Sequence, residues 1–175
     1  ELLKIGLQYA QRLNGLILST PADRNIGNKS GVHEGKVSTR NGLSATPTLS
    51  ETLQIQRDLA VLEYSGGKLH IPCISSAEAV ELIRNGKKKG LQVTCSVALA
   101  NLVFTENELS DFNSIFKLEP PLRTDNDRTE LRQAVVDGTI DLVTSNHEPL
   151  NVELKHLEFE YATSGTVGLE AMFGI

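Results

Sequence analysis

The feature that most constrains the fold is an alternation of short apolar runs with helical patterns along the chain. The apolar runs, each typical of a buried strand, cover residues 16–18, 69–74, 91–99 and 140–143. Strands that alternate with helices imply right-handed crossovers and a parallel sheet. The sequence therefore predicts an α/β fold with four parallel strands.

The helical segments carry start and stop signals. Apolar residues recur with helical spacing over residues 2–13, and Asn14-Gly15 supplies the stop. The pattern Thr48-x-x-Glu51 is typical of a capping box and predicts a long helix, which Gly66-Gly67 would end.

The same capping pattern recurs at Ser75-x-x-Glu78 and predicts a helix closed by Gly86 and Gly90. A further helix is predicted for residues 128–136. By contrast, residues 22–46 and 101–121 show no sustained period. We expect these two segments to be long irregular connections.

Composition excludes several classes of protein. The 175 residues carry a net charge of −5, with 39% hydrophobic and 22% charged residues, which is ordinary for one globular domain. No basic footprint for nucleic acid and no apolar run long enough to cross a membrane is present. Cys73 and Cys95 both lie in apolar strand-like runs, which favours reduced core thiols. We expect a soluble, cytoplasmic protein.

Polar residues and long loops follow the predicted strands. Thr144, Ser145, Asn146 and His147 come directly after the last strand. This polarity is typical of the catalytic face of a barrel. We interpret residues 1–175 as a single fragment, half of an eight-stranded (β/α)8 barrel, and a small open α/β sheet is the alternative. Either arrangement leaves two sheet edges, which favours self-association.

Several sequence blocks, together covering nearly the whole chain, resemble the dihydroorotases of the amidohydrolase superfamily. In chain order they are Gly31-Val32-His33-Glu34-Gly35, Arg57-Asp58, Leu69-His70-Ile71-Pro72-Cys73-Ile74-Ser75, Pro120-Pro121-Leu122-Arg123, Asp137-Gly138-Thr139-Ile140-Asp141, Asn146-His147-Glu148-Pro149 and Gly165-Thr166-Val167-Gly168-Leu169-Glu170. The resemblance places the chain at strands five to eight of that family's barrel. Because the chain also starts at Glu1 without a methionine, we expect it to be part of a larger protein.

The resemblance implies the reversible cyclisation of N-carbamoyl-L-aspartate to dihydroorotate in pyrimidine synthesis. In the family, zinc polarises the ring amide carbonyl and activates water, and an aspartate after strand eight moves the proton. The family's metal-binding histidines correspond here to Ser19 or Thr20 and to Cys73, and its catalytic aspartate corresponds to Asn146. Hydroxyl and amide groups are poor zinc ligands, and an amide cannot act as a base near neutral pH.

Two substrate-binding positions of the family are also altered. Glu119 stands where the family has an asparagine before the double proline, and Leu150 stands where it has a histidine. Glu119 would place a negative charge opposite an anionic substrate. From these departures we expect an impaired site and no cofactor in this fragment.

The four histidines offer no replacement metal site. His70 occupies a non-ligand position of the family and is expected in the barrel wall or core, whereas His33 and His156 are expected to be exposed. His147, beside the altered aspartate position, could form a hydrogen bond in the mouth.

Two hypotheses on function follow from the resemblance. The first is a dihydroorotase-family protein that is catalytically impaired in this copy, with the isolated fragment inactive because half of the barrel is absent. The alternative is a non-catalytic structural partner of aspartate carbamoyltransferase. A third, more general possibility is that the mouth, with Ser145, Asn146, His147 and Glu119, binds another small molecule.

Overall fold

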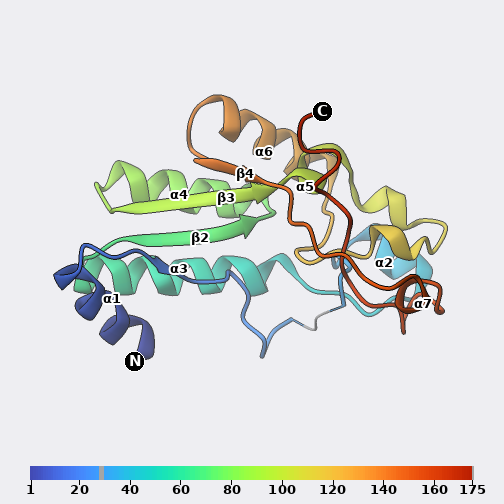
Figure 1. Cartoon of the computed structure of the whole chain (residues 1–175), viewed down its shortest axis with the longest axis horizontal. Helices are drawn as coiled ribbons and strands as arrows, with labels where there is room; N and C mark the ends of the chain where they lie inside the picture. Colours follow the sequence, from blue (N-terminus) through green and yellow to red (C-terminus); the bar gives the residue numbers. More distant parts are fainter. Residues whose placement is uncertain (28–29, 175) are drawn as a thin grey trace.

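A computed structural model describes residues 1–27 and 30–174 and contains one parallel sheet. Its strands are β1 (Ile17–Leu18), β2 (Leu69–Ile74), β3 (Val93–Ala98) and β4 (Leu142–Thr144). They lie side by side in chain order, β1-β2-β3-β4, with all three pairings parallel (Figure 1). The prediction of four parallel strands is therefore confirmed, although β3 is shorter than expected and β4 begins two residues later.

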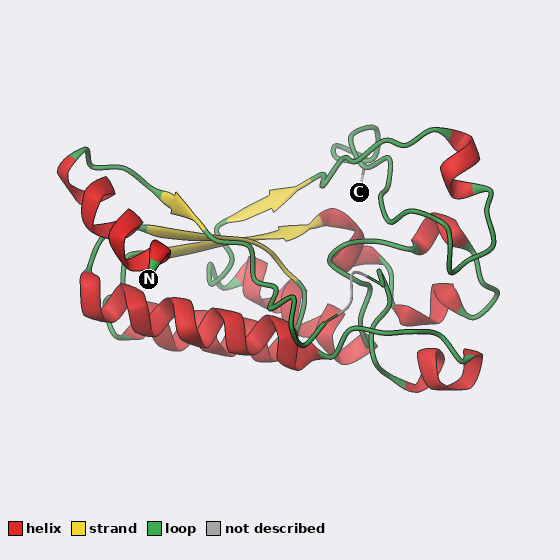
Figure 2. Cartoon of the chain, turned by 90° about the horizontal axis from the view of Figure 1, so that it is seen from below, coloured by secondary structure: helices red, strands yellow, loops and turns green. Residues whose placement is uncertain are grey.

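Four helices connect or precede these strands and cover one face of the sheet. They are α1 (Leu2–Arg12), α3 (Thr48–Ser65), α4 (Ala77–Lys88) and α6 (Asp125–Val136). Each packs against the next, α1 on α3, α3 on α4 and α4 on α6, and the long α3 runs beneath the strands in Figure 2. Their apolar side chains meet the sheet in one core that includes Leu7, Ile55, Ile71, Ile83 and Val97.

The opposite face of the sheet lacks such a cover. His70 pairs in register with Leu18 and Thr94, so these three side chains share the face that points away from the helices. Leu18 on this face is 66% exposed, and Leu142 on the edge strand β4 is 55% exposed. Parallel strands with helices on one side and an inner face left open are the geometry of half of a (β/α)8 barrel. The prediction of half of an eight-stranded barrel is confirmed.

The carboxyl ends of the strands meet the irregular part of the chain (Figure 1). Short helical segments occur there, which the sequence did not predict because none is long enough to show a hydrophobic period. They are α2 (Lys36–Asn41), α5 (Leu99–Val103), η1 (Glu106–Leu109), η2 (Ser114–Phe116) and α7 (Val152–Lys155). Asn28 and Lys29, within the expected loop at 22–46, lie outside the described residues.

The two predicted capping boxes are wrong, for one shared reason. Helix α3 begins after Pro47 without a side-chain cap, and α4 is capped by Ser76, whose hydroxyl accepts from the Ala79 N–H at 3.2 Å. Glu51 and Ser75, the expected capping residues, instead bond to each other in the interior. A tertiary contact has replaced the local one.

Other helix ends differ in smaller ways. Gly86 lies inside α4, and the chain leaves that helix through Gly90, whose φ of +81° is in the left-handed region. Helix α6 begins at Asp125, because Thr124 and Asp127 form a reciprocal capping box. Throughout the described chain, no helix is both long and apolar enough to cross a membrane.

Candidate functional site

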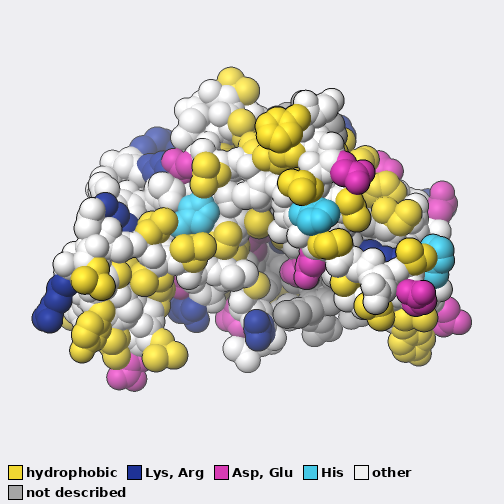
Figure 3. Space-filling view, in the orientation of Figure 1, with side chains coloured by type: hydrophobic (Ala, Val, Ile, Leu, Met, Phe, Trp, Pro, Cys, Tyr) yellow, Lys and Arg dark blue, Asp and Glu magenta, His cyan; other side chains and the backbone are white. Residues whose placement is uncertain are grey.

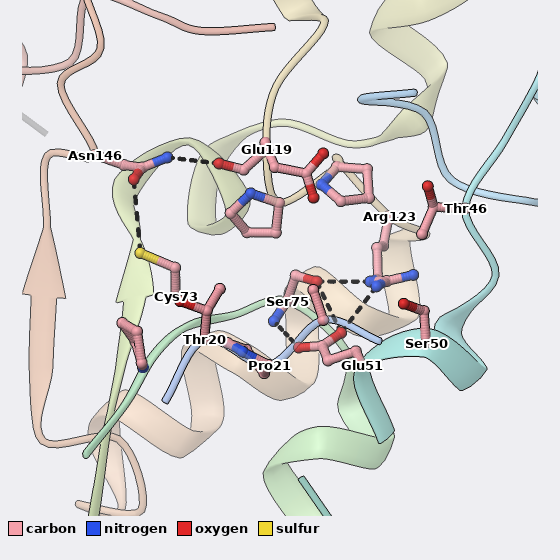
Figure 4. Close-up of a pocket in the computed structure, with 14 residues that line it drawn as sticks. Thr20, Pro21, Thr46, Ser50, Glu51, Cys73, Ser75, Glu119, Arg123 and Asn146 are labelled. Atoms are coloured by element: carbon pink, nitrogen blue, oxygen red, sulfur yellow. Dashed lines mark hydrogen bonds and ion pairs between the residues drawn. The ribbon is translucent and has the colours of Figure 1, made fainter. Parts of the chain in front are cut away.

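A pocket of about 260 Å³ opens at the carboxyl end of the strands (Figure 4). Its walls carry four proline residues, which make the lining largely apolar. The polar positions come from the ends of β1, β2 and β4, from the start of α3 and from the segment at 119–123. The lining residues are Thr20, Pro21, Ala22, Thr46, Ser50, Glu51, Pro72, Cys73, Ser75, Glu119, Pro120, Pro121, Arg123 and Asn146.

Cys73 and Asn146 face each other across the mouth of this pocket. The Cys73 thiol lies 3.7 Å from Asn146 Oδ1 and 3.6 Å from Thr144 Oγ1. The Asn146 amide group donates through Nδ2 to the backbone oxygen of Glu119 at 2.9 Å. Both Cys73 and Asn146 have positive φ, at +52° and +44°. The sheet register shifts between Ile71 and Ile74, and this irregularity holds the Cys73 side chain at the mouth rather than in the core.

A buried ionic network forms the floor of the pocket. Arg123 donates through its second terminal nitrogen to Glu51 at 2.8 Å and through Nε to the Ser75 hydroxyl at 2.7 Å. Glu51 in turn accepts from the Ser75 backbone N–H at 2.6 Å and from its hydroxyl at 2.9 Å. Arg123 and Glu51 are each only 4% exposed and Ser75 is fully buried. The charges neutralise each other with their hydrogen-bonding groups engaged, which is what burial of an ion pair requires.

His33 extends this network and is buried, so the expectation that it is exposed was wrong. Its Nδ1 lies 3.1 Å from an Arg123 terminal nitrogen, which also donates to Thr48 Oγ1 at 3.0 Å. Because an arginine can only donate, His33 Nδ1 is the acceptor and the ring is neutral. Burial, reinforced by the Arg123 charge, lowers the pKa of His33 from 6.5 to about 4, against an opposing contribution from Asp127.

The two candidate positions after β1 have different surroundings. The Ser19 hydroxyl donates to Asp58 at 2.5 Å, and Asp58 is buried and also accepts from Gln54. Thr20 is exposed and lines the pocket. Of the five positions where the resemblance places family functional residues, the structure therefore gathers Thr20, Cys73, Glu119 and Asn146 around one pocket.

Leu150 does not reach that pocket. It lines a separate hollow with Gly165 and Val167. His147, also outside the pocket, is exposed, and its Nδ1 accepts from the Leu169 N–H at 3.3 Å. Ser145 lies beside Gly168 near the carboxyl end of the chain.

The two remaining histidines lie where the sequence predicted. His70 is buried within β2 and its Nδ1 is 2.8 Å from Thr94 Oγ1. Burial lowers the pKa of His70, although the Asp141 charge acts in the opposite direction. His156 is exposed after α7.

The residues of the mouth do not fit a zinc site by themselves. Structural and catalytic zinc sites take three or four ligands from Cys, His, Asp and Glu. Among residues 1–27 and 30–174, no group of three or more such side chains is close enough to hold a metal ion. The Cys73 thiol is in contact with the Asn146 amide and the Thr144 hydroxyl, and both groups bind zinc poorly.

The floor residues are what sequence reasoning missed. Arg123 was noted only as the end of a sequence block, and Glu51 and Ser75 were interpreted as helix caps. No local signal could have identified them, because Glu51 and Arg123 are 72 residues apart in the sequence. A buried carboxylate requires a buried cation, and Arg123 satisfies this requirement.

Comparisons with known proteins agree with this fold. No protein-family profile matches the chain. Dihydroorotases from Syntrophus aciditrophicus and Desulfotalea psychrophila are 38% and 34% identical to it, over 99% and 100% of the chain and 41% and 42% of their own lengths. The structure of an L-hydantoinase (dihydropyrimidinase) from Arthrobacter aurescens superposes with a TM-score of 0.83 at 23% identity, over 98% of this chain and 39% of that one.

These proportions agree with a half barrel. The chain spans about two fifths of the length of the curated relatives that it matches. Nearly all of its own residues take part in the match. The sequence identity shows that this chain is homologous to the part of the dihydroorotases that it matches, and the superposition shows that it has the fold of half of the barrel.

Proposed function

We propose that this chain is part of a dihydroorotase-type protein of pyrimidine biosynthesis whose site, as built from these residues, is catalytically impaired. The observation that carries the proposal is the constellation at the pocket mouth. There, Thr20, Cys73 and Asn146 line one pocket. The resemblance places the family's two metal-binding histidines at Ser19 or Thr20 and at Cys73, and its aspartate at Asn146, so these positions would keep the fold and lose the functional groups.

Each change removes a separate chemical capacity. Asn146 cannot accept a proton from a nucleophilic water near neutral pH, and its nitrogen already donates to Glu119 O. The hydroxyl of Ser19 is committed to Asp58. Cys73 alone could supply one thiolate to a metal, which is fewer than the three protein ligands of a catalytic zinc site. The cyclic amide hydrolysis of dihydroorotate would therefore be slow or absent.

The test is metal analysis of the full-length protein that contains this chain, together with an assay of dihydroorotate hydrolysis. We expect no stoichiometric zinc, or one weakly held ion that is lost on Cys73→Ser, and little hydrolysis. The double variant Cys73→His with Asn146→Asp is expected not to restore activity, because the positions of Ser19, Thr20, Glu119 and Leu150 also differ. Tightly bound zinc with substantial hydrolysis by the unmodified protein would overturn the proposal.

The natural partner of this half barrel is the remainder of the same barrel. The edge strand β1 and helix α1 expose Leu2, Leu13, Leu16 and Leu18 by 49–87%, and hydrophobic side chains gather over α1 in Figure 3. Apolar surface next to an unpaired strand favours association. The isolated chain should be inactive and should self-associate, which sedimentation can measure. A monomer at all concentrations would contradict this part of the proposal.

A second candidate function is a non-catalytic structural partner of aspartate carbamoyltransferase. A retained barrel with an altered site favours it, because a structural subunit needs the surface of the fold and not its chemistry. Co-purification of the full-length protein with the transferase would support this role. A protein that elutes alone from gel filtration when the transferase is present would count against it.

A further inference from the structure

Residues 119–123 form one wall of the pocket. Pro120 and Pro121 have no backbone N–H group, so neighbouring segments must hold this wall through its carbonyl oxygens. The structure shows three such bonds on alternate residues: Asn146 Nδ2 to Glu119 O at 2.9 Å, Asn101 Nδ2 to Pro121 O at 2.9 Å and Glu106 N to Arg123 O at 2.8 Å. The wall is therefore anchored from outside, and Asn146 holds the end nearest the mouth.

The chemistry of these partners fixes the orientation of the Asn146 amide. A backbone carbonyl only accepts, so the NH₂ group of Asn146 must face Glu119 O. Its oxygen then faces the Cys73 thiol, which can donate to it. An aspartate at this position would have no N–H at neutral pH and would place a charged oxygen against a carbonyl oxygen. The anchoring bond thus requires the amide.

The backbone of Asn146 is held from its other side. The segment at residues 165–169 passes close to the end of β4. A Cβ atom on Gly168 would lie 2.1 Å from Ser145 O, so only glycine fits at this position. The Leu169 N–H also donates to His147. Both neighbours of Asn146 in the sequence, Ser145 and His147, therefore contact the segment at residues 165–169. These contacts support the backbone from which the Asn146 side chain extends.

We propose that Asn146 is a positioning residue, which fastens the double-proline wall at Glu119 to the ends of β2 and β4 and so keeps the pocket formed. The amide has a structural task that a carboxylate at this position could not perform. Asn146→Asp in this chain removes an anchor. This inference does not depend on the proposed loss of activity, because it concerns a hydrogen bond within the chain.

Hydrogen exchange of the full chain, followed by mass spectrometry on peptides that cover residues 117–124, tests the inference. Asn146→Ala should accelerate exchange there roughly fivefold, since one hydrogen bond is lost. Asn146→Asp should accelerate it more, on the order of tenfold, because repulsion adds to the loss. Asn151→Asp is the matched control, with the same charge change at an exposed position, and should leave these peptides unchanged.

A second measurement uses the two cysteines. Cys95 is fully buried, and burial raises its pKa to about 12, so a thiol reagent should modify only Cys73 in the folded chain. In Asn146→Asp the new carboxylate should move the pH profile of Cys73 modification upward, with reaction several-fold slower at neutral pH. Asn151→Asp should not move it.

Two results would overturn the proposal. One is unchanged exchange at 117–124 in both Asn146 variants. The other is an equal acceleration in every peptide of the chain, which would mean general destabilisation rather than release of one wall. Neither result would bear on zinc content or hydrolysis, so failure of this inference is distinguishable from failure of the proposed function.

Discussion

The floor and the mouth of the pocket are both polar, but they are built in opposite ways. The floor, Arg123 with Glu51, Ser75 and His33, is buried and ionic and has bonds of 2.6–3.1 Å. The mouth, Cys73 with Asn146, is half-buried and neutral, with sulfur contacts of 3.6–3.7 Å. Removing Arg123 or Glu51 from the floor would leave the other residue as an unpaired buried charge, whereas the mouth contains no ion pair. Substitutions at the mouth can therefore leave the ion pair of the floor intact.

Removing the cation of the floor should have the largest effect on stability. Arg123→Met should lower the free energy of unfolding by about 3–5 kcal/mol, because it leaves Glu51 buried without its partner. Denaturant unfolding followed by circular dichroism measures this. The control is Lys89→Met, which removes an ion pair to Glu63 in which both side chains are more than half exposed, and it should cost less than about 1 kcal/mol. Equal costs for the two variants would refute the distinction.

The next largest effect is expected from pH. The unfolded chain protonates His33 near pH 6.5, whereas the folded chain resists protonation down to about pH 4. Stability from His33 is therefore complete above pH 6.5 and declines as the pH falls toward 4, by up to roughly 3 kcal/mol. In His33→Gln the slope of the unfolding free energy across this window should be smaller.

Other groups titrate in the same region and set the controls. Burial raises the pKa of Glu106, which lies near His33 around Gly35, and a raised carboxyl pKa makes stability fall as the pH rises. This contribution remains in the His33 variant and does not remove the difference in slope. His156→Gln, at an exposed site, should leave the slope unchanged. A slope that is identical in all three proteins would contradict the role given to His33.

The smallest effect on stability is expected from a substitution at the mouth. Cys73→Ser conserves the size of the side chain at a half-exposed position and should change the free energy of unfolding by less than about 1 kcal/mol. The same denaturant measurement applies. A loss above about 2 kcal/mol would mean that the mouth supports the fold as strongly as the floor.

Much of the fold could be predicted from the sequence because its signals are local. Apolar runs around Leu69 to Ile74 and the helical spacing that follows Thr48 are properties of adjacent residues, and they predicted the parallel sheet. The short helices α2, α5 and α7 were missed because four to six residues carry too little pattern. The candidate site was only partly predicted. The resemblance identified Cys73, Glu119 and Asn146, which do line one pocket, but gave no account of Arg123 and Glu51 beneath them.

By itself, the sequence determined the order of strands and helices and the half-barrel class, and its resemblance to the dihydroorotases indicated which positions to inspect. Only the tertiary structure decided what the polar residues do. Glu51 and Ser75 have the pattern of helix caps, yet they bond across the interior, because Arg123 provides a buried charge that a local cap does not. Asn146 looked like a lost aspartate, yet its amide holds Glu119 O. Partners separated by 24 to 72 residues meet only when the chain folds, so no local pattern could have named them.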